Sequence, residues 1–502
     1  MTPEPVAADR RLWWTFAALA LLYVLPFWIV RHVPTVDGPC HTYNAWVLRH
    51  FADAGRFPLF QQFYAINLKP YPNWISHGTM ALLMFAVPAA VAEKLLVSGY
   101  VLAFLFGAWY LAGSVRPGER WLAFLAFPFA YHQLFQYGFY NFSISVALFL
   151  IILGCWWRHR ERPGLAFALG INLLLWLCYF SHILSFGLAL IAIAVLWLAT
   201  LRRGTWRRHL WHVPILLPQL ALPLWFFARQ GGGEVPAGWP LAQLVKYLFR
   251  LEVLFALGGA RLGCGIALAL LFLALFVLSC RRGRGEENAF PILALLFAAL
   301  YFVSPEGMAG GWLLKNRLSL YPFLLLIPWL SPRLWRFGRQ AETAGAAVLI
   351  LAALLNLGYL VQGYRELGAT VDGYLAALAP LAPNGRVLAL TFEHAGPTDV
   401  LSHAIAYAAL EKGAVDWDNY ESKVPFFPVR FREDVKFPDI PGVLWDPGSY
   451  RVLPNRELVD AVYVWRMPPE NRLGVRLRRF YELTAEGGGG QLFERRQAPP
   501  GP

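Results

Sequence analysis

The sequence predicts an all-α polytopic membrane bundle followed by a small C-terminal α/β soluble domain. Of the 502 residues, 57% are hydrophobic and only 15% are charged, whereas soluble globular proteins carry about 25% charged residues. Apolar runs recur up to residue 362, and most are close to the roughly 20 residues that a helix needs to cross a bilayer. Because no backbone crosses lipid with unsatisfied polar groups, we expect these runs to be helices.

Basic residues gather in short clusters between the apolar runs. By the positive-inside rule such clusters are cytoplasmic, so the net charge of +13 reports orientation rather than a nucleic-acid partner, which would need a continuous basic face. The clusters lie at 116–120, 158–162, 202–208, 281–284 and 333–339. The apolar segments lie at 12–30, 73–90, 92–113, 121–135, 141–157, 165–180, 184–201, 211–228, 262–280, 289–304, 317–331 and 343–362.

The five clusters fall on one side, but Arg10 and Arg11 lie on that side only if one early segment does not cross. Segment 73–90 begins with polar residues, contains His77 and ends near Pro88, so we expect a juxtamembrane or re-entrant helix there. This leaves about 11 spans, with the N-terminus inside and the C-terminus outside. The alternative is twelve spans with the N-terminus outside. No small-residue cleavage site follows the first run, so we expect an uncleaved first span.

The tail from 363 to 502 is more polar and predicts a domain of its own, outside the membrane domain of residues 1–362. We expect strands at 386–392 and 460–466, a helix at 398–413 and a hairpin at 480–496. No glycine-rich phosphate loop is present, so we expect a lid or docking module without chemistry of its own. The five cysteines show no disulfide or metal-ligand spacing.

The stretch VPTVDGPCHTYNAW at 33–46 opens the largest predicted outer loop, 31–91. Asp37 precedes Gly38 and Pro39, so it can cap a helix that starts near His41. It can equally serve as a general base or a ligand for a divalent ion, because a carboxylate beside a partly dehydrated cavity accepts a proton near neutral pH. Both interpretations remain open.

Two further polar segments are candidates for substrate contacts. In NLKPYPNW, residues 67–74, Lys69 either snorkels to lipid headgroups or contacts a phosphate. AYHQLFQYGFYNF, residues 130–142, is either an interfacial aromatic belt or a sugar site, because amides and imidazoles bind hydroxyls while rings stack on apolar faces. Its candidate ligands are His132, Gln136 and Asn141, and His182 in YFSHILS either joins them or satisfies a neighbouring helix.

The stretch SPEGMAGGWLLKNRLSLYP, residues 304–322, places positive charge on the predicted outer side. Lys315 and Arg317 therefore oppose the orientation rule, and a phosphate at the membrane surface would suit the pair. Glu306 lies in the glycine-rich loop before them.

Taken together, these motifs resemble the GT-C glycosyltransferases, integral membrane enzymes that use polyprenyl-phosphate sugars and include the aminoarabinose and protein mannosyl transferases. The resemblance covers roughly residues 10–335 and rests on the Asp37 loop, the LKPYPNW stretch and the basic late loop. It implies that Asp37 is the catalytic base or metal ligand, assisted by His41. It also implies that Lys69, and more loosely Lys315 and Arg317, contact the donor phosphate.

The resemblance implies an inverting transferase that works on the outer, periplasmic face of a bacterial inner membrane, with an envelope glycan, lipid or protein as acceptor. Many members have a second acidic residue in the loop that corresponds to 132–141, and this chain has none there. His132, Asn141 or Glu306 would have to replace it. A single carboxylate makes a poor Mg²⁺ or Mn²⁺ site, so dependence on a divalent metal ion stays open.

Other functions compete with this one. A lipid-linked glycan flippase or exporter would be expected to have charges within its spans and broken helices near the midplane. The spans here are nearly free of charge, which favours chemistry at the surface. A glycan polymerase or ligase of another fold remains a further alternative.

Overall fold

A computed structural model describes residues 4–202, 204, 206–229, 235, 238–257, 262–280, 285–331, 338–396, 398–440 and 446–496. The basic residues at 281–284 and 332–337 lie outside this description. The chain divides into two compact units. The first comprises residues 1–25, 98–135 and 140–361, and the second comprises 26–97, 136–139 and 362–502. The second unit therefore contains both the predicted outer loop and the tail.

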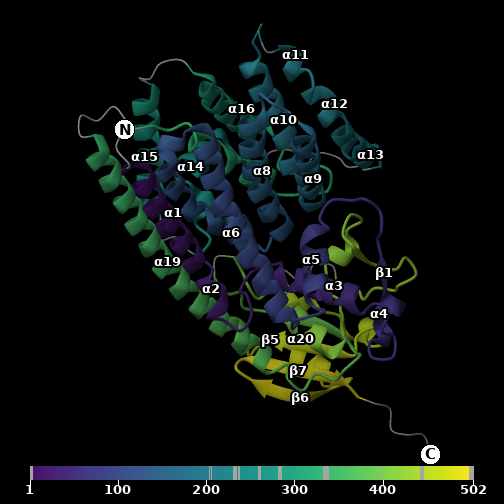
Figure 1. Ribbon diagram of the computed structural model, residues 1–502. Helices are drawn as coiled ribbons and strands as arrows, with labels where there is room; N and C mark the ends of the chain where they lie inside the picture. The colour runs from purple at the N-terminus through teal and green to yellow at the C-terminus, as the bar shows by residue number, and fades with distance from the viewer. Residues whose placement is uncertain are drawn as a thin grey trace, which may run out of the picture. The chain divides into compact units, whose positions relative to one another are not determined.

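Seven helices in the described part of the chain are long and apolar enough to cross a membrane, which indicates a membrane protein. They lie at 10–28, 89–115, 140–159, 183–200, 263–280, 286–303 and 340–376. The last belongs to α19 (Gly338–Ala376), the long helix in Figure 1, which runs well past the predicted segment 343–362. Over the part of the chain that the structure describes, the expected count of about 11 spans is not confirmed.

The other predicted segments are short or broken for identifiable reasons. Segment 211–228 is divided into α12 (His212–Leu216), η2 (Leu217–Leu220) and α13 (Ala221–Arg229), because Pro214, Pro218 and Pro223 remove backbone donors. Segment 317–331 falls on α17 (Leu314–Leu318) and α18 (Tyr321–Leu326). Segment 165–180 is α9 (Leu165–Ser181), with 17 residues. Segment 121–135 is mostly a 3₁₀ helix, η1 (Pro117–Tyr131).

Helices of the first unit approach one another closely at glycine. A Cβ on Gly107 of α6 (Ala89–Val115) would lie 3.2 Å from the Ala147 carbonyl oxygen of α8 (Tyr140–His159). In lipid, where no hydrophobic force pulls helices together, such small-residue contacts provide the packing. α10 (Ile183–Thr200) and α16 (Ala289–Val303) complete this packed group, with α15 (Leu262–Cys280) and α14 (Leu241–Phe249) beside them.

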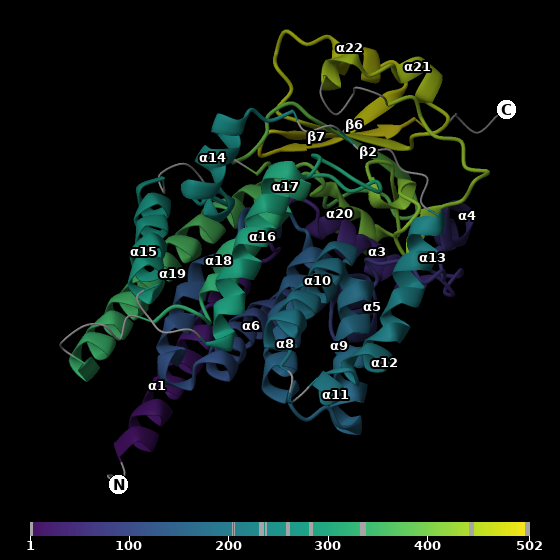
Figure 2. The same cartoon turned by 90° about the horizontal axis from the view of Figure 1, so that it is seen from above.

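The second unit contains a five-stranded sheet of order β3-β2-β5-β7-β6. The strands β2 (Arg386–Thr391), β3 (Val415–Asp416) and β5 (Ala461–Trp465) are parallel, and β7 (Gly490–Arg495) and β6 (Tyr481–Gly487) form an antiparallel hairpin at one edge. α21 (Val452–Asn455) and α22 (Leu473–Leu477) lie on the side of the sheet opposite α20 (Ile405–Lys412) (Figure 2). The predicted strands and hairpin are present, and the predicted helix is shorter than expected but ends at Gly413, as its sequence indicates.

The first-loop residues form short elements in the same unit. These are α3 (Gly38–His50), α4 (Pro58–Phe63), β1 (Tyr64–Ile66) and α5 (Ile75–Leu83). α5 has nine residues, which span only about 14 Å at 1.5 Å per residue and cannot cross a bilayer. This agrees with the expectation for segment 73–90. β1 pairs with β4 (Val429–Phe431) of the tail, so loop and tail share one fold.

Candidate functional site

The turn before α3 holds Asp37 without using its side chain as a cap. Asp37 occupies the N-cap position and Pro39 the first helical turn, but the carboxylate makes no capping hydrogen bond. The backbone N–H of Asp37 donates instead to the Tyr137 carbonyl at 3.0 Å. The carboxylate is therefore available for other partners.

Those partners come from the tail. The Tyr420 hydroxyl donates to Asp37 Oδ2 at 2.6 Å, and His403 Nε2 lies 3.8 Å from Oδ1. Burial raises the pKa of Asp37, against the smaller opposing effects of His403 and Tyr420. A carboxyl group with a raised pKa in contact with a phenol and an imidazole is suited to accept a proton.

The segment VDWDNYESK, residues 415–423, supplies most of this polar surface, and it begins with the short strand β3. Its Asp418 carboxylate bonds His403 Nδ1 at 2.9 Å. Burial and the neighbouring Asp418 raise the pKa of Asp416 to about 7. Asn419 exchanges hydrogen bonds with Asn44 of α3 at 2.8 and 3.2 Å. The segment is thus attached to the first-loop helix by a buried polar network.

A second cluster lies on the same segment and involves His41, His77 and Glu421. His41 Nδ1 is 2.7 Å from Glu421 Oε1, His77 Nε2 is 2.9 Å from Oε2, and the two nitrogens are 3.1 Å apart. The three side chains are buried, with at most 4% of any of them exposed. Among the described residues, these three could share a metal ion, and Asp37, the predicted ligand, is not one of them.

The charges of this cluster are strongly coupled. Burial lowers the pKa of His77, and the neighbouring His41 lowers it further, against Glu421. Burial also lowers the pKa of His41, but the Glu421 carboxylate raises it by more. Burial would raise the pKa of Glu421, yet the two imidazoles hold it well below its ordinary value. Glu421 is therefore an anion that faces two histidine nitrogens.

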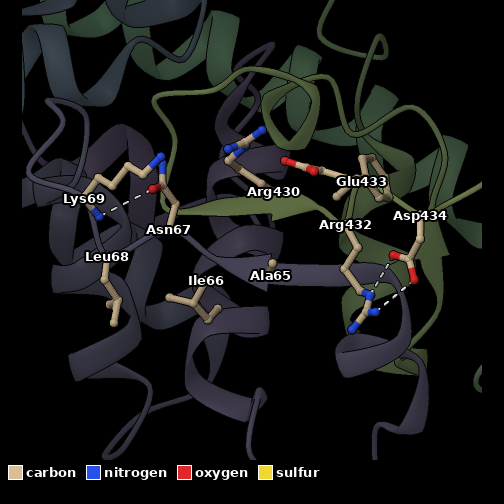
Figure 3. Close-up of a pocket in the computed structure, with 10 residues that line it drawn as sticks. Ala65, Ile66, Asn67, Leu68, Lys69, Arg430, Arg432, Glu433 and Asp434 are labelled. Atoms are coloured by element: carbon tan, nitrogen blue, oxygen red, sulfur yellow. Dashed lines mark hydrogen bonds and ion pairs between the residues drawn. The ribbon is translucent and has the colours of Figure 1, made fainter. Parts of the chain in front are cut away.

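Lys69 lies apart from these clusters in the second unit, in an open cleft of about 750 Å³. The cleft follows the paired strands β1 and β4, and Figure 3 shows Lys69 and Arg430 on the side away from the Arg432–Asp434 ion pair. Arg432 bonds Asp434 with two hydrogen bonds of 2.9 Å, so its charge is largely compensated. Lys69 and Arg430 are the cations that this cleft offers to an anion.

The remaining predicted residues lie mostly in the first unit, where three of them surround the Phe142 ring. His132 and His182 have their ring centroids 6.1 and 5.3 Å from that of Phe142. The Arg317 guanidinium lies 5.1 Å from the same centroid and hydrogen-bonds His182 Nε2. His132 accepts a bond from the Phe135 N–H through Nδ1, and its buried Nε2 has no partner among the described residues. An imidazole N–H left in this way can donate to a substrate hydroxyl.

Other predicted residues have structural partners. Lys315 is fully buried, and its ammonium donates to the Tyr301 and Phe302 carbonyls at 3.1 Å. These carbonyls end α16, so Lys315 caps a helix C-terminus. Gln136, in the second unit, bonds the Pro34 carbonyl and the Tyr364 hydroxyl. Asn141 is buried beside Phe142, and Glu306 lies in the loop between α16 and α17, where burial raises its pKa.

Sequence reasoning missed the contribution of the tail. We expected a module without chemistry, but Tyr420, Glu421 and His403 complete the surroundings of Asp37 and His41. A signal was present: six of the nine residues in VDWDNYESK are polar or charged, and its first two residues form a buried strand. Its partners on α3 could not be inferred, because they are about 375 residues away in the chain.

Comparison with known proteins does not assign the chain to a family. No family model matches the chain, and no curated protein matches it.

Proposed function

We propose that the protein is a membrane glycosyltransferase that moves a sugar from a polyprenyl-phosphate donor to an acceptor hydroxyl at the outer face of a bacterial inner membrane. This proposal rests mainly on the hydrogen bonding and the pKa of Asp37. It stands where a helix cap would stand but makes no capping bond, and its carboxylate is held by Tyr420 with a raised pKa. A base of this kind fits an acceptor hydroxyl.

In the proposed reaction Asp37 takes the proton of the acceptor hydroxyl. The acceptor oxygen forms a bond to the anomeric carbon, the bond from that carbon to the phosphate oxygen breaks, and polyprenyl phosphate leaves with the bonding electrons. The configuration of the sugar inverts. Since the leaving group is a stable anion, cations contribute more than a general acid would. Lys69 and Arg430, which line one cleft of the second unit, are the side chains that we assign to this role.

The placement of charge also favours a transferase over a transporter. Residues 140–157, 183–200, 263–280 and 289–303, which make up most of four of the membrane-length helices, contain no charged side chain. A flippase that moves a charged headgroup through the bilayer is expected to carry polar groups at the midplane. Surface chemistry therefore fits the chain better than translocation.

The test is a transfer assay with purified protein in lipid nanodiscs and a panel of radiolabelled polyprenyl-phosphate sugars. We expect one donor to release polyprenyl phosphate and to label an acceptor. Asp37→Asn should lower kcat by about 100-fold or more, as the loss of a general base does. The matched control is Asp53→Asn, an exposed acid of the same loop that should leave turnover unchanged.

Two results would count against this function. One is full turnover in correctly folded Asp37→Asn protein, which would remove Asp37 from the reaction. The other is movement of a lipid-linked sugar across the bilayer without release of polyprenyl phosphate, which would support the flippase.

A further inference from the structure

We propose that His41, His77 and Glu421 bind one divalent transition-metal ion of the zinc type, which clamps the segment 415–423 to the helices α3 and α5. This inference does not depend on glycosyl transfer. It rests on the geometry of the three side chains and of the groups behind them.

The ligand atoms already converge on one point. The contacts among His41 Nδ1, His77 Nε2 and the Glu421 oxygens measure 2.7, 2.9 and 3.1 Å. Ligands at about 2.0–2.1 Å from a tetrahedral zinc ion stand roughly 3.3 Å from one another. Each side chain therefore has to move outward by only a few tenths of an ångström to admit the ion.

The far sides of both imidazoles are bonded to the backbone. His77 Nδ1 lies 3.1 Å from the Asn73 carbonyl oxygen and 3.3 Å from the Ser76 hydroxyl, and a proton on Nδ1 would be donated to that carbonyl. His41 has a hydrogen bond to the backbone of Gly138. Metal-binding histidines are held in this way, with the outer nitrogen bonded to a carbonyl or carboxylate and the inner lone pair facing the ion.

Two of the protonation patterns leave this arrangement in conflict. If His77 is neutral with its proton on Nδ1, the Nε2 lone pair faces a carboxylate oxygen at 2.9 Å. If both histidines are doubly protonated, two N–H groups face each other across 3.1 Å. Moreover, Glu421 Oε1 is buried and has no hydrogen-bond partner of good geometry, although His41 Nδ1 is 2.7 Å away. A cation between the three groups removes each of these conflicts.

The donor set selects the class of metal. Two imidazole nitrogens and a carboxylate suit zinc and its first-row neighbours, whereas Mg²⁺ prefers oxygen ligands alone. Mg²⁺, one of the two ions that the family resemblance left open, therefore does not suit these residues. Asn44 donates to Glu421 Oε2 at 2.8 Å, which orients the carboxylate from behind.

The ion would join segments that are far apart in the chain. His41 and His77 are separated by 36 residues, and His77 and Glu421 by 344. A clip that closes a long loop removes much conformational entropy from the unfolded chain. Because Tyr420 is adjacent to Glu421, the bound ion would also hold the Tyr420 hydroxyl against Asp37.

The first test is the metal content of full-length protein purified in detergent without chelator, measured by mass spectrometry of the elements. We expect about one zinc-type ion per chain. His77→Ala and the near-isosteric Glu421→Gln should each reduce the content by at least about tenfold. His32→Ala is the matched control, because His32 is also a buried first-loop histidine but bonds Asp372 instead.

The second test keeps the native sequence and so does not depend on whether a variant folds. Chelation of wild-type protein should lower its Tm, and added zinc should restore it. Replacement by Co²⁺ should produce visible absorption bands that His77→Ala lacks. The proposal is wrong if wild-type protein from zinc-supplemented cells contains less than about one tenth of an ion per chain and its Tm does not respond to zinc.

Discussion

Gly138 shows how one residue positions the candidate base. It has a positive φ of 84°, and a Cβ there would lie 2.5 Å from the Gly38 nitrogen and 2.6 Å from the Asp37 nitrogen. Both neighbours are backbone atoms, which cannot move away by a change of rotamer. Only glycine therefore allows the turn at 136–139 to lie against the start of α3.

Gly138→Ala should destabilise the protein by about 2–4 kcal/mol, from the left-handed backbone and the overlap together. Thermal unfolding in detergent measures this effect as a lowered Tm. The matched control is Gly78→Ala in α5, where a Cβ meets nothing within 4 Å. That change should be neutral or slightly stabilising because alanine favours helix. An equal Tm for the two variants would contradict the proposed close approach.

At the scale of elements, an ion pair joins the parallel strands of the second unit to its hairpin. Arg386 at the start of β2 bonds both Asp460 oxygens, at 2.7 and 2.8 Å. Arg495 of β7 lies 2.8 Å from the same carboxylate. Burial raises the pKa of Asp460, but Arg386 lowers it by more, so the net shift is downward. The ionised carboxylate is thus the form that holds β2, β5 and β7 in register.

Asp460→Asn should therefore cost about 1–3 kcal/mol of unfolding free energy near pH 7, as expected for charge-assisted hydrogen bonds. Since the folded pKa lies below the unfolded value of 3.8, this contribution is present above pH 3.8 and is lost as pH falls through the folded pKa. Chemical denaturation at a series of pH values measures the gap between wild type and variant. A gap that stays constant into the acid range would be inconsistent with this assignment.

At the scale of the whole molecule, hydropathy and charge decide how the chain meets the membrane. The described chain has seven membrane-length apolar helices, and the broken segment 212–229 between two of them contains three prolines. The basic clusters that are described at 116–120 and 158–162 follow helices of the first unit. By the positive-inside rule we expect these clusters to face the cytoplasm.

Reporter fusions test the resulting orientation. Alkaline phosphatase joined to the C-terminus should be active, because the enzyme folds only outside, and green fluorescent protein joined to the N-terminus should fluoresce inside. A phosphatase inserted after residue 161 should be inactive. A dark N-terminal fusion with an active C-terminal one would instead favour the alternative with an outside N-terminus.

The sequence alone determines the membrane class, the main apolar helices and the strands of the tail, because hydrophobic length and periodicity are local properties. It also singles out Asp37 and His41. Only the tertiary structure decides what these residues touch. Tyr420 and Glu421 reach them through a fold in which loop and tail pair as β1 and β4. The lysine that appeared suited to phosphate, Lys315, caps α16 instead. Such partners are set by packing over hundreds of residues, which no local pattern encodes.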